Sequence, residues 1–391
     1  MAIVLRATMP NFTAGKIDKL VKKTDEARTI FKSATTAFCL LSLFLLCAAA
    51  QVSAQHYLRT DLVSDVPGLA AATDANLVNA WGLTSSSTSP WWVANNGTGV
   101  STLYNGAGQK QALTVTIATP PGDLNPATPT GVVFNGSTDF QLVSGTPSTA
   151  AHFIFVTEDG TISGWNSGTR SVLKVNNSGS AIYKGTTIAQ AGGINFLYVA
   201  NFFGGTVDVF DTNYAAVTLP AGAFTDPNLP EGFAPFNVQN IGGDIYVAFA
   251  QQDAEKHDEV AGRKLGFVDS FDSNGTLLQR FENGPWMNAP WGLALAPSHF
   301  GKASGELLVG MFGSGQIATF DAATGDFEGL LRDRHGKPIK VDGLWALRFG
   351  NGGGAGPATT LFFTAGPNDE NDGLFGTLVP IPAELAEVDE P

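Results

Sequence analysis

The sequence predicts an all-β protein, a six-bladed β-propeller in which an N-terminal strand closes the last blade. A block of a short strand, a polar hairpin with a glycine, a second strand and an aromatic-Asp/Asn turn occurs six times, with hairpin glycines at Gly99, Gly160, Gly205, Gly266, Gly315 and Gly373. These glycines lie 45 to 61 residues apart, which suits four short strands with their connections. No segment after Ala54 keeps an apolar helix period for three turns, so we expect almost no helix.

The hairpins and the strands before them define the blades in order. The clearest hairpins begin at Trp92, Phe153, Leu197 and Leu307, and two divergent ones begin at Ile245 and Leu361. Each follows a strand rich in small residues, seen best after Asn79, Asn288 and Asp342. We expect this strand to be innermost, because Gly and Ala allow close backbone approach. The propeller is predicted over residues 55–381 with four strands in each blade, a strand from His56 closing the ring, and a disordered tail at 382–391.

The N-terminal segment has the layout of a secretory signal. Residues 37–50 are uncharged and apolar, seven basic residues precede them, and Val52-Ser53-Ala54 follows as a small-x-small triplet. We predict a signal peptide over residues 1–54, with cleavage after Ala54 and a secreted protein, extracellular or periplasmic, that has no membrane span in its mature form. A buried N-terminal helix is the alternative.

Composition excludes several kinds of site and partner. Both cysteines, Cys39 and Cys47, lie in the apolar segment, so the mature chain has no disulfide, cysteine-ligated zinc or cysteine nucleophile. The whole chain has a net charge of −13, and removal of seven basic and three acidic residues with the signal leaves −17. This strongly acidic balance argues against nucleic acid and anionic membranes as partners. It fits either cation binding or solubility outside the cell.

Several long motifs resemble one protein family. The segments LVSDVPGLA, DANLVNAWGLT, TEDGTISGWN, FTDPNLPEGFAPFNVQNIGG and DGLWALRFGNGG are similar to those of exported bacterial six-bladed β-propellers of unknown function, which resemble NHL-repeat propellers. The likeness covers residues 57–380. Some members of that family end in a PEP-CTERM sorting signal, which this chain lacks, so free secretion is favoured. The resemblance implies the fold and transfers no catalytic residues.

One face of the predicted disc gathers the polar loops. In a four-stranded blade, the connection into the inner strand and the hairpin between the second and third strands open on the same face. A divalent metal such as calcium could bind there, at the mouth of the axial channel, to carboxylate and amide ligands. The residues that would converge on it from four blades are Glu158, Asn201, Asn288 and Asp342.

The most charged segment is an insertion over residues 251–264. Its ionisable residues are Asp253, Glu255, His257, Asp258 and Glu259. A histidine beside carboxylates can ligate a metal or act as an acid/base pair, while the alternative is a solvated acidic loop. A second polar loop, at 366–373, has oxygen-bearing side chains but lacks the spacing of an EF-hand.

The tryptophans separate into architectural and candidate ligand-binding positions. Trp81, Trp291 and Trp345 occupy equivalent inner-strand positions and are expected to pack between blades. Trp286 breaks this register and could form a platform for a ligand.

Two functions remain open on the sequence alone. The first is a binding or scaffold propeller that engages an extracellular protein, glycan or small ligand through one loop-rich acidic face. The second is a metal-dependent hydrolase or lyase, resembling six-bladed lactonases, with ligands at the axial channel. The chain lacks the serine-hydrolase elbow, the His-Glu-x-x-His zinc motif and the phosphate loop, so whether it is an enzyme stays undecided. We expect a monomer.

Overall fold

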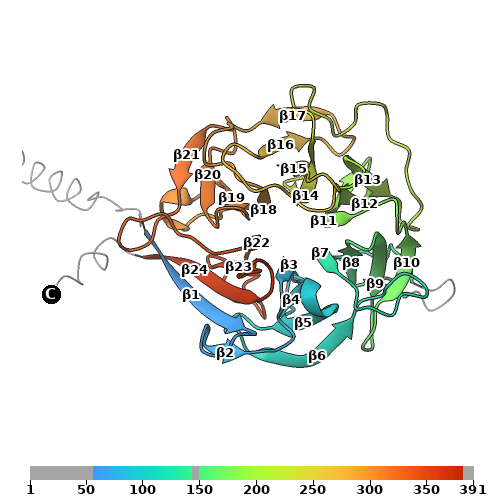
Figure 1. Cartoon of the computed structure of the whole chain (residues 1–391), viewed down its shortest axis with the longest axis horizontal. Coiled ribbons are helices and arrows are strands. Elements are labelled where there is room, and N and C mark those ends of the chain that lie inside the picture. Colours follow the sequence, from blue (N-terminus) through green and yellow to red (C-terminus); the bar gives the residue numbers. More distant parts are fainter. Residues whose placement is uncertain (1–55, 143–148, 382–391) are drawn as a thin grey trace, which may run out of the picture. The chain divides into compact units, whose positions relative to one another are not determined.

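Six β-sheets, antiparallel except for the short parallel pair of β1 and β2, surround a common axis in the computed structural model, which describes residues 56–142 and 149–381 (Figure 1). The chain is therefore an all-β, six-bladed propeller. Helix among the described residues is limited to the 3₁₀ turns Asn96–Thr98 and Gly301–Ala303. No helix of this part of the chain has the length and apolar character needed to cross a membrane. The predicted signal peptide and the predicted disordered tail lie outside the described residues.

The blades follow one another along the chain. The first contains β3 (Ala80–Thr84), β4 (Trp91–Asn95), β5 (Val100–Tyr104) and β6 (Lys110–Thr116), the second β7 (Pro129–Phe134), β8 (Phe153–Thr157), β9 (Thr161–Trp165) and β10 (Val172–Asn176), and the third β11 (Tyr183–Ala191), β12 (Ile194–Asn201) and β13 (Thr206–Phe210). The fourth contains β14 (Phe233–Ile241), β15 (Asp244–Gln251), β16 (Phe267–Phe271) and β17 (Leu277–Arg280), and the fifth β18 (Pro290–Leu295), β19 (Leu307–Met311), β20 (Ile317–Phe320) and β21 (Phe327–Leu330).

The sixth blade joins distant parts of the chain. It contains β22 (Leu344–Phe349), β23 (Leu361–Ala365) and β24 (Leu374–Ile381) together with β1 (His56–Ser64) and the short β2 (Ala72–Thr73). β1 pairs antiparallel with β24 from His56 opposite Ile381 to Ser64 opposite Leu374. This outer strand covers the edge of β24 that would otherwise expose unpaired backbone groups.

The third blade departs from the expected four strands. β11, β12 and β13 form it, and beyond them the outer side has an isolated bridge between Phe210 and Ala216. Pro220, Pro227 and Pro230 follow in the connection to β14. Proline has no N–H to donate to a ladder, which explains why this stretch does not extend the sheet.

Every inner strand carries a β-bulge at the equivalent place. The register of β3, β7, β11, β14, β18 and β22 against the neighbouring second strand shifts by one residue. A bulge leaves one residue unpaired and redirects its side chain. The buried residues at these bulges are Trp81, Thr130, Lys184, Phe236, Trp291 and Trp345.

Aromatic rings fill the propeller axis, four of them from these bulges and one, Phe312, from the residue that follows β19. The Trp81 and Trp345 rings stack with centroids 3.7 Å apart, and the Trp291 ring meets both edge-on, at 6.4 and 6.0 Å. The Phe312 ring stacks on Trp345 at 4.1 Å, and Phe236 meets Trp345 from the fourth blade at 5.9 Å. Blades four and six are not neighbours, so these contacts place the rings at the axis. We call these five rings the aromatic plug.

The plug changes two expectations. Trp81, Trp291 and Trp345 pack against one another at the centre of the ring, rather than only between adjacent blades. The expected axial channel is closed part-way by their side chains. A mouth lies above the plug, on the loop face, and a small cavity lies below it.

Candidate functional site

Lys184 lies at the centre of the candidate site. It is the bulge residue of β11, and its side chain is fully buried at 0% exposure. Its Nζ lies 5.1 Å from the centre of the Trp81 ring and 5.8 and 6.0 Å from those of Phe202 and Phe236. Aromatic faces attract a cation at these distances. The ammonium therefore lies against the aromatic plug on its loop-face side.

Two carboxylates hold the Lys184 ammonium. Glu158 Oε1 lies 2.5 Å from Nζ, and Asp258 Oδ1 lies 3.2 Å from it. Glu158 comes from the β8–β9 hairpin, whereas Asp258 comes from the insertion after β15. The Asp258 side chain remains 59% exposed, and its Oδ1 also lies 2.8 Å from His257 Nδ1, within hydrogen-bond distance. The insertion thus reaches the centre of the disc.

A chain of hydrogen bonds continues from this ion pair across the first and sixth blades. Asn96 Nδ2 donates to Glu158 Oε2 at 2.7 Å, and Asn79 Nδ2 donates to Glu370 Oε2 at 2.7 Å. Asn79 Oδ1 accepts from the Trp345 indole at 2.9 Å. Asn79 therefore joins the plug below to the carboxyl of Glu370 above.

We call the polar side chains over the plug the axial mouth. They are Asn79, Asn96, Glu158, Lys184, His257, Asp258, Glu259 and Glu370.

Burial and charge set the protonation of the axial mouth. Burial lowers the pKa of Lys184, but the carboxylates of Glu158, Glu259 and Asp258 raise it by more, so the ammonium stays charged. Burial raises the pKa of Glu259 to about 8, because Lys184 offsets only part of the desolvation. Burial also raises the pKa of Glu370, despite the opposing hydrogen bond from Asn79. The pKa of Asp258 is lowered, since Lys184 and His257 outweigh desolvation.

The insertion divides into residues at the axial mouth and residues that shape the loop. His257, Asp258 and Glu259 belong to the mouth. Asp253 instead accepts the backbone N–H of His257 at 2.8 Å and so stabilises the turn. Glu255 is exposed on that turn. The loop is therefore ordered by its own backbone contacts rather than extended into solvent.

The four residues predicted as metal ligands have different surroundings. Glu158 is bonded to Lys184. Asn201 accepts the N–H of Gly204 at 3.0 Å and donates to Asp208 at 3.0 Å. Asn288 and Asp342 also bind nearby loop backbone, with Asn288 accepting from Gly262 at 2.6 Å and Asp342 from Asn368 at 3.0 Å.

A different acidic group is brought together at the axial mouth. Ligand atoms of Glu158, His257 and Asp258 all lie within 4.8 Å of one another. This group combines one predicted metal ligand with two residues of the insertion. Among the described residues, this group could hold a divalent cation through its histidine and carboxylate ligands.

Trp286 lies away from the axial mouth. Its ring stacks on Phe327 with centroids 3.8 Å apart, and a Cβ at Gly284 would lie 2.3 Å from it. The ring borders a surface cavity of about 460 Å³ that Arg263 and Arg332 also line. Much of the ring surface is thus used in packing, and an edge is left for contact with a ligand.

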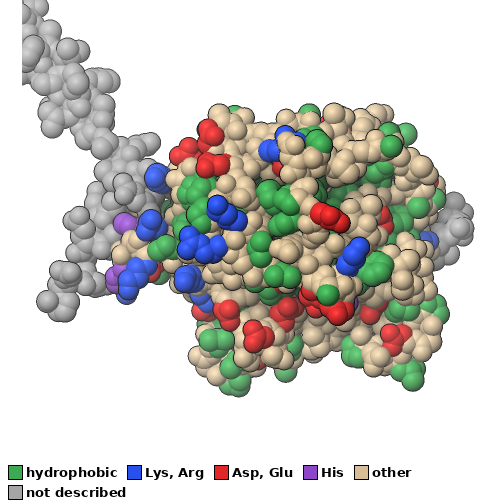
Figure 2. Space-filling model, turned by 45° about the horizontal axis from the view of Figure 1, so that its top comes forward, with side chains coloured by type: hydrophobic (Ala, Val, Ile, Leu, Met, Phe, Trp, Pro, Cys, Tyr) green, Lys and Arg blue, Asp and Glu red, His purple; other side chains and the backbone are tan. Residues whose placement is uncertain are grey.

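Figure 2 shows that charge is unevenly distributed on the surface. Basic side chains gather toward one side, near histidines, and the acidic ones form separate groups. A cavity of about 270 Å³ in the fifth and sixth blades is lined by His56, Lys302 and Arg332 and also by Glu306 and Glu328. The cavity is therefore of mixed charge.

Sequence reasoning missed Lys184, although its position carried a signal. Lys184 occupies the bulge site that Trp81, Phe236, Trp291 and Trp345 fill in four other blades. A lysine among these aromatic positions marks a buried charge, and a buried charge needs a partner. Aligning the six inner strands residue by residue would have identified it.

Comparison with known proteins gives relatives but no activity. No protein-family model matches the chain. It is 31% identical over 331 residues to the uncharacterised protein R648 of Acanthamoeba polyphaga mimivirus, covering 81% of this chain and 78% of R648. It is also 31% identical over 336 residues to the uncharacterised protein L690 of the same virus, covering 81% and 84%.

The similar solved structures are distant. Virginiamycin B lyase from Staphylococcus aureus aligns with a TM-score of 0.48 and 9% identity over 83% of this chain and 99% of the lyase. The WD40 β-propeller domain of Doa1 aligns at 0.43 and 9%, over 82% and 96%. At these values the likeness carries no functional information. By its identity and coverage with the viral proteins, the chain belongs to the same protein family as the uncharacterised mimivirus proteins R648 and L690.

Proposed function

We propose that this protein is a secreted, monomeric binding propeller that recognises a cationic group of its ligand at the axial mouth. The observation that carries the proposal is the imbalance of charge there. Four carboxyl groups, those of Glu158, Asp258, Glu259 and Glu370, interact with the single ammonium of Lys184.

Because of this imbalance, the carboxyl groups of Glu259 and Glu370 lack a full counter-charge. Burial raises the pKa of both Glu259 and Glu370, which means that their charged forms are not fully compensated within the protein. An ammonium or guanidinium group above the mouth would supply the missing charge and lower both pKa values. Ligand binding should therefore release protons near neutral pH, where Glu259 titrates.

Exposure makes the upper side of the axial mouth accessible. The side chains of Asp258 and His257 are 59% and 47% exposed, whereas Lys184 is fully enclosed. A ligand would meet the Asp258 carboxylate first and the half-buried glutamates behind it. A rigid propeller with polar groups on loops is well suited to such binding.

Calorimetric titration with an oligolysine peptide tests this function. Wild type should bind it and release protons, seen as a heat that changes with the ionisation enthalpy of the buffer. The double variant D258N/E370Q should lose at least about tenfold in affinity, equal to about 1.4 kcal/mol.

Asp244 provides the matched control. It is the exposed first residue of β15, next to the hairpin with β14 on the face opposite the axial mouth, so D244N removes one charge and should bind as wild type does. Equal losses in D244N and D258N/E370Q would mean that only net charge matters, and the proposed site would be wrong.

A metal-dependent hydrolase is the second candidate, because Glu158, His257 and Asp258 bring three ligand atoms within 4.8 Å. Against it, the Lys184 ammonium already bonds two of these residues. The buried Lys184 ammonium would strongly repel a divalent cation bound to the same carboxylates.

Thermal melts with calcium, zinc and a chelator separate the two functions. Wild type should melt at the same temperature in all three conditions. A stabilisation by metal that H257A abolishes would favour the hydrolase, since a ligand that binds only the folded state raises its stability.

A further inference from the structure

The surface cavity beside Trp286 brings two arginines together in an acidic protein. Arg263 belongs to the insertion after β15, in the fourth blade, and Arg332 follows β21, in the fifth. Both side chains are exposed. The cavity has a volume of about 460 Å³, which is within the range of small-ligand sites. It is therefore large enough for a ligand that the two guanidinium groups could hold together.

No carboxylate neutralises these two arginines. The ion pairs of the described residues include neither of them, and no aspartate or glutamate lines the cavity. Glu328, which follows Phe327 on β21, lines the neighbouring cavity instead, because side chains alternate along a strand. Arg332 also borders that cavity and donates to the Gly336 carbonyl oxygen at 2.7 Å. The Arg263 guanidinium bonds no described residue and is available to a ligand.

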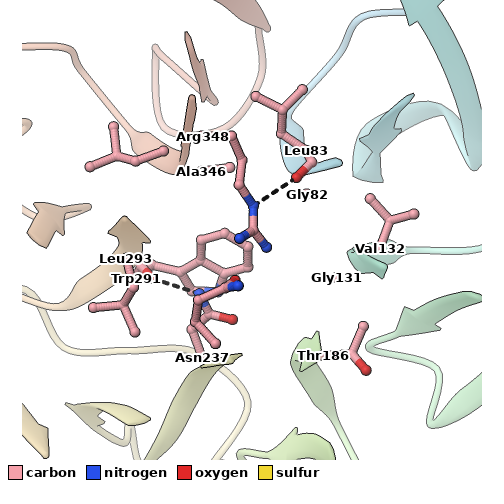
Figure 3. Close-up of a pocket in the computed structure, with 12 residues that line it drawn as sticks. Gly82, Leu83, Gly131, Val132, Thr186, Asn237, Trp291, Leu293, Ala346 and Arg348 are labelled. Carbon is pink, nitrogen blue, oxygen red and sulfur yellow. Dashed lines mark hydrogen bonds between the residues drawn. The ribbon is translucent and has the colours of Figure 1, made fainter. Parts of the chain in front are cut away.

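The axial cavity below the aromatic plug has a different arrangement. There Arg348 Nε donates to the carbonyl oxygen of Leu83 at 3.2 Å, and Asn237 Nδ2 donates to that of Trp291 at 2.7 Å (Figure 3). The protein backbone thus supplies acceptors for these two side chains. The cavity beside Trp286 is the one that leaves a charged donor to its ligand.

Neutral polar groups lie beside the arginines. Side chains of Asn288, Ser314 and Gln316 line the same cavity, and the Gln316 amide bonds no described residue. Ser314 Oγ and Trp286 Nε1 are shielded from water and have no hydrogen-bond partner among the described residues. A shielded donor without an acceptor is unfavourable. Oxygen atoms of a ligand placed against these groups would therefore be stabilising.

The remaining wall of the cavity is apolar. It consists of Pro285, Trp286, Phe327 and Leu330. A ligand that matches the whole lining needs an apolar surface for this wall, hydroxyl groups for the serine and the amides, and a negative charge for the arginines. A sugar ring that carries a carboxylate has all three, since its C–H groups are apolar.

We infer that this cavity is a binding site for an acidic sugar, a uronic acid residue whose carboxylate lies at Arg263 and Arg332. The planar guanidinium fork matches the two oxygens of a carboxylate. The inference is independent of the proposed function, because the axial mouth would hold a cationic group with carboxylates, whereas this cavity would hold an anionic group with arginines.

Magnetic resonance of isotope-labelled protein titrated with methyl glucuronide tests the site. The Trp286 indole N–H signal, assigned by its absence in W286F, should shift until the site is saturated. R263Q should bind at least about tenfold more weakly, because it loses a charged donor. The matched control is R170Q, which removes an exposed arginine of the second blade and should bind as wild type does.

Two related compounds test the class of ligand. Methyl glucoside lacks the charge and cyclohexanecarboxylate lacks the hydroxyl groups, so each should bind at least about tenfold more weakly than methyl glucuronide. Equal binding of either compound, equal losses in R263Q and R170Q, or a Trp286 signal that the glucuronide does not move would overturn the inference. D258N/E370Q should still bind the glucuronide, which keeps this result separate from the test of the axial mouth.

Discussion

Lys184 Nζ lies 2.5 Å from Glu158 Oε1 and 5.1 Å from the centre of the Trp81 ring. One buried ammonium thus joins an ion pair above to the aromatic plug below. The relationship depends on the β11 bulge, which turns Lys184 out of the strand ladder toward the axis. Loops of the second and fourth blades meet at this one atom.

Replacing Lys184 should be strongly destabilising. K184M leaves the carboxylates of Glu158 and Asp258 without their cation, and removal of one partner of a buried pair costs about 3–5 kcal/mol. Denaturant unfolding followed by fluorescence would measure the loss. K184M/E158Q should recover part of it, because the glutamine carries no uncompensated charge.

The exposed Lys337 gives the control for this change. K337M should alter the free energy of unfolding by no more than about 0.5 kcal/mol. A K184M protein as stable as K337M would show that the ion pair contributes little.

Glu259 should make stability fall with rising pH. Its pKa in the folded protein is raised to about 8, so between about pH 4.5 and 8 the folded state binds the proton more tightly than the unfolded state. The stability that Glu259 contributes is fully present below about pH 4.5 and is lost as the pH rises through about 8.

The variant E259Q isolates this effect from other titrating groups. The difference in free energy of unfolding between wild type and E259Q should shift against wild type by on the order of 2 kcal/mol from pH 5 to pH 8.5. Denaturant titrations at several pH values measure it. A difference that does not vary with pH would contradict the raised pKa.

The six-bladed architecture could be predicted because local sequence patterns specify each blade. Hairpin glycines, alternating strands and small inner-strand residues recur in each copy, so six blades follow from the sequence. The third blade was expected to have four strands and has three, since prolines follow β13. The secretory signal, and the resemblance to an exported bacterial family, stay predictions; the relatives described above are viral.

The site could be predicted only in part, because it depends on contacts between distant segments. The insertion was identified from its charge, and Asp258 does reach the centre of the disc. The plug and its two flanking cations were not foreseen. Bulges direct Lys184 and Trp345 to the axis. Contacts there join residues of non-adjacent blades, and no local sequence pattern predicts such contacts.

Asn79 should be needed both for its hydrogen bonds and for its backbone. Its φ of 45° lies in the left-handed region that favours glycine and asparagine. Its side chain bonds Glu370 and the Trp345 indole. N79A removes both bonds and adds backbone strain, with an expected cost of about 3 kcal/mol. N79G removes the bonds alone and should be about 1 kcal/mol more stable than N79A, as measured by denaturant unfolding.

Gly82 should tolerate no side chain, because adjacent inner strands approach closely there. A Cβ at Gly82 would lie 2.3 Å from the carbonyl oxygen of Thr130, which belongs to the backbone of the next blade and cannot rotate away. G82A should therefore cost about 3 kcal/mol through displaced strands. At Gly353 the nearest atom to an added Cβ is 3.5 Å away, so G353A should remain within about 0.5 kcal/mol of wild type. Equal stability of G82A and G353A would contradict this prediction, because it would mean that the inner strands can separate without cost. The plug residues pack closely on the same strands, so such a separation should be unfavourable.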